Sequence, residues 1–167
     1  MWPITIEMSG PARGKGAGRA AVTGNGHAHI YTDSKTRKYE SQLRFAAQQQ
    51  MGGAPPTAQP IAVAIEARIA VPSTWSKKKR ALALAGRVLP TTRPDLENYA
   101  KAMDALNGIV WLDDKQIVDE HISKLYSERP GLTIRIMSVV PPPLSAEPRR
   151  DSQAERFARR QPELFAC

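Results

Sequence analysis

Cysteine is almost absent from this sequence, with Cys167 as its single occurrence in 167 residues. A disulfide framework and a cysteine-based zinc site are therefore excluded. Long hydrophobic runs are also missing, since no apolar stretch approaches the ~18 residues of a membrane span and nothing resembles a signal peptide. These absences predict a cytoplasmic protein that does not cross a membrane.

Several common motifs of phosphate and hydrolase sites are missing as well. The glycines between residues 9 and 29 do not follow the GxxxxGK[ST] spacing of a phosphate-cradling loop, and no nucleophile elbow frames the serines. Internal repeats are absent. The length fits a single domain over 1–140, followed by a Pro-rich linker and a charged tail over 141–167 that we expect to be flexible.

Charge is abundant and unevenly distributed. The chain has 24 Lys and Arg against 16 Asp and Glu, a net charge of +8, which favours nucleic acid as a partner first and a membrane surface second. Seven acids lie between Asp95 and Glu120, whereas the stretch from Arg68 to Arg93 has seven basic residues and no acid. A cationic surface around an acidic pocket can hold a polyanion and a divalent cation together. This contrast predicts a metal-dependent nuclease.

The hydrophobic pattern predicts an α+β fold, a single domain with a mixed β-sheet and packed helices. Turn signals separate the predicted elements. In order they are a strand over 4–8, a flexible basic loop or open hairpin over 9–29, helices over 35–51, 73–85 and 96–107, and strands over 61–71, 116–126 and 131–137. We expect the last two strands to be joined as a hairpin by the turn at residues 128–131.

The predicted helix over 96–107 carries the acidic cluster on one face. Glu97, Lys101 and Asp104 align at helical spacing, so their side chains point the same way. The apolar side chains on the opposite face, which should pack against the sheet, are Leu96, Tyr99, Met103 and Leu106. Lys101 could therefore form a plain ion pair with Glu97, or assist at a phosphate in a nuclease.

Asp95 can share a cation with Glu97 only if it precedes the regular helix, because residues two apart on a helix do not face each other. Pro94 supports this placement, since proline suits a first helical turn and forces Arg93 to be extended. The alternative is that Asp95 and Glu97 only complement the helix dipole and that the Asp113-Asp114 pair lies in a polar turn. Taken together, these carboxylates offer the hard oxygen ligands that Mg²⁺ prefers, and we expect them to converge.

The spacing of these residues follows a family pattern. That pattern is an R-x-D-[LI]-[DE]-N start, a Lys three residues after the Asn, then D-A-L, and a hydrophobic residue before D-D-x-Q-[IV]. The matching positions are Asp95-Leu96-Glu97-Asn98, Lys101, Asp104-Ala105-Leu106 and Asp113-Asp114-Lys115-Gln116-Ile117. The chain thus resembles the RusA family of Holliday-junction resolvases, specifically across about 93–137 and more loosely over 4–71.

The resemblance implies an α+β subunit that acts as a homodimer and nicks two opposed strands of a four-way DNA junction with Mg²⁺. It places the essential acids, which would also be the metal ligands, at Asp95, Glu97 and Asp114, and the essential lysine at Lys101. Better-studied members tend to have Asp at the Glu97 position, and the added methylene leaves metal position and cleavage rate open. Asp113 and Asn98 would support the site.

Two groups of basic residues are predicted to bind the DNA backbone without reading sequence. They are Arg13, Lys15 and Arg19 in the glycine-rich segment, and Lys77, Lys78, Lys79 and Arg80 in the short basic helix. The second group could equally be a solvated surface or a localisation signal. Two alternatives to a junction resolvase stay open: a non-catalytic DNA-binding protein, and a metal-dependent nuclease that acts on another nucleic acid.

Overall fold

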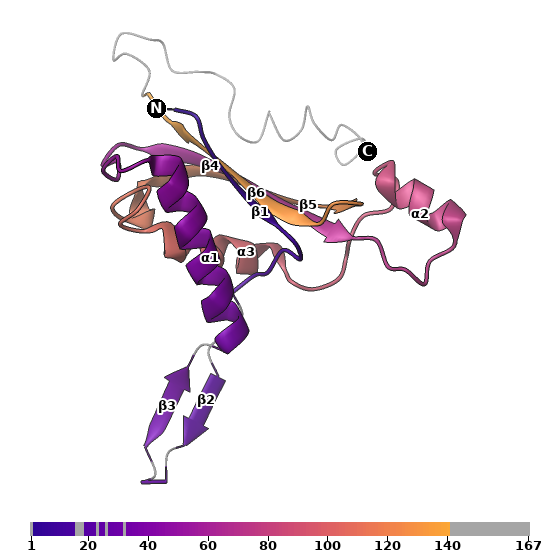
Figure 1. The fold of residues 1–167 in the computed structure, drawn as a ribbon, viewed down its shortest axis with the longest axis horizontal. Helices are drawn as coiled ribbons and strands as arrows, with labels where there is room; N and C mark the ends of the chain where they lie inside the picture. Colours follow the sequence, from indigo (N-terminus) through magenta and orange to yellow (C-terminus); the bar gives the residue numbers. More distant parts are fainter. Residues whose placement is uncertain (1, 16–18, 23, 26, 32, 141–167) are drawn as a thin grey trace, which may run out of the picture.

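The computed structural model describes most of the chain. The described residues are 2–15, 19–22, 24–25, 27–31 and 33–140, so the tail predicted over 141–167 lies outside them. A four-stranded sheet forms the centre, in the order β1-β6-β4-β5 (Figure 1). Its strands are β1 (Ile4–Ser9), β4 (Ile61–Ala70), β5 (Ile117–Ser127) and β6 (Gly131–Ser138).

One face of this sheet is apolar and buried. Alternate residues of β1, β6 and β4 lie opposite one another in the antiparallel ladders, so their side chains gather on the same side. The central members of this set are Ile4, Ile6, Ile134, Ile136, Val63 and Ile65. Helices α1 (Ser34–Met51) and α3 (Leu96–Ala102) pack onto this face with the 3₁₀ helix η1 (Met103–Leu106). The predicted α+β class, a mixed sheet with packed helices in a single domain, is confirmed.

Helix α1 begins and ends close to where the sequence predicts. The Asp33 carboxylate accepts hydrogen bonds from the backbone N–H of Lys35 and Thr36, and Gly52 ends the helix in the left-handed conformation with φ of 55°. Leu43 is buried, whereas Phe45 is 63% exposed. Two residues correspond to about 200° of helical turn, so Phe45 points away from the face that Leu43 buries.

The predicted helix over 96–107 is present as α3 and η1. Tyr99, Met103 and Leu106 are buried against the sheet, as the pattern requires. Leu96 is 42% exposed, because it lies at the first position of the helix, beyond the part that contacts the sheet. The burial of Tyr99 and its neighbours turns the charged face of α3 outward.

The prediction of a hairpin between the last two strands is wrong. Both β5 and β6 pair with β4, β5 in parallel and β6 antiparallel, so β4 lies between them. With β4 between them, β5 and β6 lie two strand spacings apart, which amounts to roughly 10 Å. The three residues 128–130 can cover this distance at about 3.3 Å each. A short turn between antiparallel strands is therefore compatible with a third strand inserted between them.

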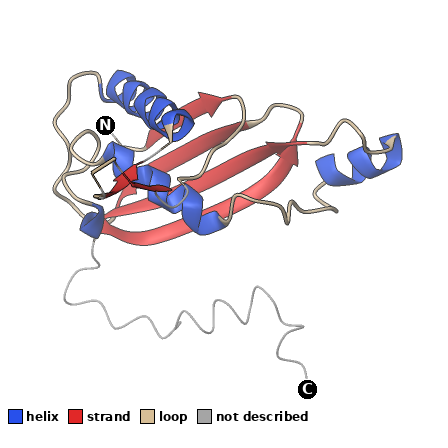
Figure 2. Cartoon of the chain, turned by 90° about the horizontal axis from the view of Figure 1, so that it is seen from below, coloured by secondary structure: helices blue, strands red, loops and turns tan. Residues whose placement is uncertain are grey.

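Two elements extend from the body of the molecule in Figure 1, and one of them, α2, also stands apart in Figure 2. A hairpin of β2 (Arg19–Val22) and β3 (Ala28–Tyr31) projects beyond the N-terminal end of α1, and α2 (Lys77–Leu84) lies past the end of the sheet where β4 finishes. The predicted open hairpin and short basic helix are both present. No helix of the described residues is long and apolar enough to cross a bilayer.

The first part of the glycine-rich segment is packed, contrary to the prediction of a loose loop. The backbone N–H of Lys15 donates to the carbonyl of Asn98 in α3 at 2.7 Å. Gly14 lies against the same residue, so that a Cβ atom at position 14 would be 2.6 Å from the Asn98 Cβ. The close contact between Gly14 and Asn98 requires glycine, because Asn98 belongs to a helix that is itself packed on the sheet.

Replacing Gly14 should destabilise the protein. We expect Gly14→Ala to lower the free energy of unfolding by about 1–3 kcal/mol, because the added methyl group overlaps a fixed part of α3. Gly24→Ala is the matched control, since a Cβ at that position meets nothing within 4 Å. Urea denaturation of both variants measures the difference. Equal stability of the two variants would contradict the packing of this segment against α3.

Candidate active site

Asp95 lies immediately before α3, as predicted. It is the N-cap residue, with extended backbone angles of φ −72° and ψ 156°, and its side chain makes no capping hydrogen bond. The carboxylate is exposed and is not used to satisfy the helix terminus. Asp95 is therefore available for another ligand. The alternative that Asp95 only complements the helix dipole needs no capping hydrogen bond and stays a prediction.

Lys101 and Glu97 form an ion pair one turn apart on α3. The Lys101 Nζ lies 2.6 Å from Glu97 Oε1, and both side chains are at least half exposed. The hydrogen bond and the positive charge of Lys101 hold the pKa of Glu97 below its ordinary value near 4.5. Glu97 is thus ionised at neutral pH, and the pair is lost only as pH falls through the lowered pKa. The plain ion pair expected as one alternative for Lys101 is present.

Asp113 and Asp114 differ in their surroundings, since Asp113 caps a short helix and Asp114 is exposed. Asp113 caps the 3₁₀ helix η2 (Asp114–Gln116), with its carboxylate accepting from the N–H of Lys115 at 3.0 Å. Gln116 completes this capping box and also donates to the carbonyls of Thr57 and Gln59. Asp114 is exposed. The supporting role expected for Asp113 thus has a structural cause.

An open cavity of ≈ 560 Å³ lies between the second half of α3 and the beginning of β5. Its charged lining residues are Lys101, Asp104, Asp114, Lys115, Asp119 and Glu120. Two of the predicted site residues, Lys101 and Asp114, therefore meet at one cavity. Burial raises the pKa of Glu120, because the charged form of a carboxylate loses solvation there.

Asp119 and Glu120 were not identified from the sequence. Glu120 lies opposite Val63 in the β4–β5 ladder, and Val63 belongs to the face on which α3 packs. In the sequence, both acids lie at the start of a predicted strand, five and six residues after Asp114. This position indicates a place at the cavity only if β5 is known to pair with β4, and the sequence pattern did not predict that pairing.

The three predicted metal ligands do not converge. Within the described ranges, no three His, Cys, Asp or Glu side chains are close enough together to hold a metal ion. Asp95 and Glu97 do not line the cavity that Asp114 lines. The seven residues of α3 span about 10 Å, and Asp95 lies at the end away from the cavity. Neighbouring carboxylates repel one another, and Glu97 is turned to its partner Lys101.

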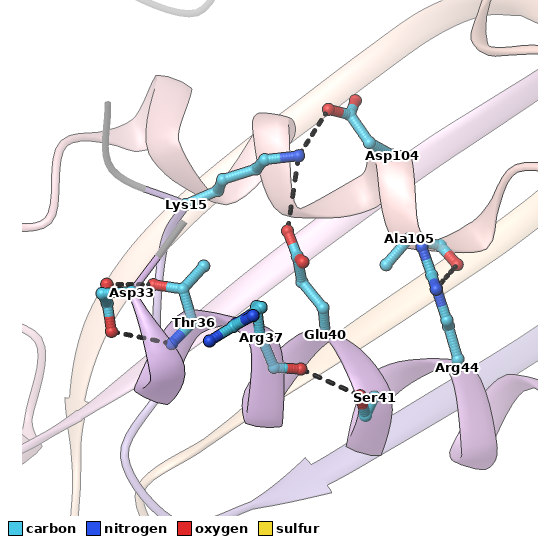
Figure 3. Close-up of polar contacts among 9 residues, drawn as sticks. All are labelled: Lys15, Asp33, Thr36, Arg37, Glu40, Ser41, Arg44, Asp104 and Ala105. Carbon is cyan, nitrogen blue, oxygen red and sulfur yellow. Dashed lines mark hydrogen bonds and ion pairs between the residues drawn. The ribbon is translucent and has the colours of Figure 1, made fainter. Parts of the chain in front are cut away.

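Lys15 is held by two carboxylates (Figure 3). Its Nζ lies 3.1 Å from Asp104 Oδ2 and 3.3 Å from Glu40 Oε1, which joins the N-terminal segment to both η1 and α1. Partial burial lowers the pKa of Lys15, but the hydrogen bond to Asp104 and the charges of Glu40 and Asp104 outweigh this and raise it. A DNA contact by Lys15 stays a prediction, and its ammonium group would have to be shared with these acids.

The other predicted DNA contacts differ in their surroundings. Arg13 is exposed, and Arg19 begins β2, but its side chain lies outside the described part. On α2, Lys77, Lys78 and Lys79 are exposed, whereas Arg80 is half-buried and donates to the carbonyl of Pro72 at 3.3 Å.

Aromatic packing anchors α2 to the sheet. Lys79 lies over the Trp75 ring at 3.9 Å, and Trp75 packs edge-on against Tyr126 of β5 with ring centroids 5.2 Å apart. Trp75 thus connects the basic helix to a buried residue of the sheet.

Comparison with known proteins places this chain in a family. The family described as Endodeoxyribonuclease RusA matches residues 11–137, a range that includes α2, α3 and the cavity. The uncharacterized protein YqaN of Bacillus subtilis is 32% identical over 139 residues, which cover 81% of this chain and 96% of YqaN. The match extends over most of both proteins. The chain therefore belongs to the RusA family of Holliday-junction resolvases, which are endodeoxyribonucleases.

Proposed function

We propose that the protein is a Mg²⁺-dependent endonuclease that resolves four-way DNA junctions by paired symmetric nicks during recombination and repair. The observation that carries this proposal is the meeting of Lys101 and Asp114 at one open acidic cavity in a RusA-family chain with a net charge of +8. The positive charge attracts the DNA, and the cavity offers carboxylates at the place where a phosphate would enter.

Asp95, Glu97 and Asp114 would hold the Mg²⁺ ion. Carboxylate oxygens are the hard ligands that this ion takes, and the Asp95 side chain makes no capping bond. When bound, Mg²⁺ supplies an activated water and neutralises charge at the reacting phosphate. Closing this set around one ion would require Glu97 to turn away from Lys101, and would also require Asp95 and Asp114 to lie closer together than they do in this structure.

Lys101 would then act on the substrate directly. Lys101 is one of the residues that line the cavity, and its side chain lies on the outward face of α3. Released from Glu97, it could donate a hydrogen bond to a phosphate oxygen and stabilise the charge that develops there. The ion pair with Glu97 would keep Lys101 oriented before DNA binds.

The acids should be required for cleavage and not for binding. We expect Asp95→Asn, Glu97→Gln and Asp114→Asn each to lower the cleavage rate by on the order of 10³-fold, comparable to the loss of one charge-stabilising group in other active sites. Lys101→Ala should behave similarly. Junction affinity should be unchanged or higher, because a carboxylate near phosphate is removed. Cleavage of a synthetic four-way junction with and without Mg²⁺, together with titration of the junction, measures both properties.

Glu128→Gln is the matched control, since Glu128 is an exposed acid in the turn before β6 and lies outside the cavity. It should cleave like the parent protein. Full activity of any of the three acid variants would remove that residue from the site. Junction binding without cleavage by the parent protein would favour a non-catalytic DNA-binding protein, and preferred cleavage of RNA or flapped DNA would identify a different substrate.

Helix α2 should bind the DNA backbone. Exchanging Lys77, Lys78 and Lys79 together for Ala should reduce junction affinity and lower the slope of log affinity against log salt by about 0.9 for each phosphate that is no longer neutralised. Titrations at several salt concentrations measure this slope. Lys35 and Lys38 are exposed on α1 and provide the control, because their exchange for Ala should leave the slope nearly unchanged. An unaltered slope in the α2 variant would assign these lysines to a solvated surface.

We further propose that the protein acts as a homodimer. Each subunit would bring its own copy of the acidic cavity described above, and resolving a junction requires two cuts related by two-fold symmetry. A symmetric pair would present both cavities to one junction. Sedimentation at micromolar concentration should give twice the subunit mass of 18.4 kDa. A protein that stays monomeric alone and on the junction would contradict coordinated resolution and indicate a simple nicking enzyme.

A further inference from the structure

The segment that leads into the active site has little structure of its own. Residues 88–94 lie between the turn that follows α2 and Asp95, and they contain no helix or strand. Pro90 and Pro94 have no N–H to donate. Within the described part of the chain, the backbone groups of this segment make no hydrogen bond to other backbone groups. Among the described residues, any hydrogen bond that holds the backbone of this segment must therefore come from a side chain.

Lys124 of β5 supplies that support. Its Nζ donates to the carbonyl of Thr92 at 2.9 Å and to the carbonyl of Pro94 at 3.1 Å. No other hydrogen bond between described residues reaches 88–94. Lys124 lies opposite Ala67 in the β4–β5 ladder, so it points to the buried face of the sheet, where α3 packs. The small Ala67 side chain beside it leaves room for the long lysine side chain.

Asp95 depends on this backbone for its position. Its carboxylate makes no capping hydrogen bond that would fix it relative to α3. The two carbonyls that Lys124 binds belong to the residues one and three positions before Asp95. A charged donor forms stronger hydrogen bonds than a neutral one, and one ammonium group can serve both carbonyls at once. The path of the chain into Asp95 is thus fixed from the sheet.

We infer that Lys124 is a positioning residue for catalysis, which holds the Thr92–Pro94 backbone so that the Asp95 carboxylate is presented at the active site. This inference rests on the proposed nuclease function. It assigns no contact with DNA to Lys124, because the lysine is half-buried and two of its three N–H donors are used by the two carbonyls. Lys124 acts through Asp95, which it positions from the sheet by way of the backbone before it.

The test compares three single variants with the parent protein. Lys124→Met keeps a side chain of similar length and removes the donors, whereas Lys124→Arg keeps a charged donor. Lys38→Met is the matched control, since Lys38 is exposed on α1, an element remote in sequence from residues 88–94. Four properties are measured: single-turnover junction cleavage, junction affinity, thermal unfolding, and amide hydrogen exchange of the peptide that covers 90–98.

Lys124→Met should fold and bind the junction as the parent protein does, while cleavage falls by on the order of 10²-fold, the loss that a displacement near 1 Å can cause in an active site. Hydrogen exchange should become faster in the 90–98 peptide and stay unchanged in β4. Lys124→Arg should recover much of the rate, and Lys38→Met should change none of the four properties. This combination separates positioning from a general loss of stability.

Three results would overturn the inference: cleavage by Lys124→Met at the parent rate, unchanged exchange in 90–98, or a rate loss fully explained by weaker DNA binding or partial unfolding. Asp95→Asn in the same assay separates this inference from the function on which it rests. If the parent protein cleaves, Asp95→Asn does not, and Lys124→Met cleaves normally, only the role of Lys124 fails. If the parent protein cleaves no nucleic acid, the proposed function itself fails.

Discussion

The apolar face of β4 is the constraint on which the rest of the structure depends. Ile61, Val63, Ile65 and Ala67 are at most 2% exposed, and β5 and β6 pair with this strand on either side. Helices α1 and α3 cover the same face. Since Tyr99 must point into that core, the charged side chains of α3 point outward. The acids of the proposed site are therefore oriented by the burial of their apolar neighbours.

The sequence predicted what depends on near neighbours in the chain. The period-two pattern of β4, the span of α1 and the extended Asp95 before α3 each follow from a few adjacent residues. The order of strands does not follow from them. Residues 128–130 connect β5 and β6 through a turn short enough for a hairpin, and only the pairing of both strands with β4 distinguishes the two arrangements.

Most features of the site that the sequence did not predict depend on contacts between residues distant in the chain. Lys15 could be read as a free cation, yet it lies between Glu40 and Asp104, and Lys124 had no assigned role before its two carbonyl partners were known. Glu120 belongs to the cavity because of its register with β4. The family resemblance singled out Lys101 and Asp114, which line the cavity, but it could not show that Asp95 and Glu97 lie apart from that cavity.

The pairing of β1 with β6 also determines when the domain can be completed. Ile4 lies opposite Ile136, so the first strand of the sheet is hydrogen-bonded to the last. Contacts this distant in sequence require closure of a long loop and slow the folding of a domain. During synthesis, β1 has no partner in the sheet until β6 has left the ribosome, so this ladder cannot form earlier. Nearly the whole family domain must therefore be made before its core can close.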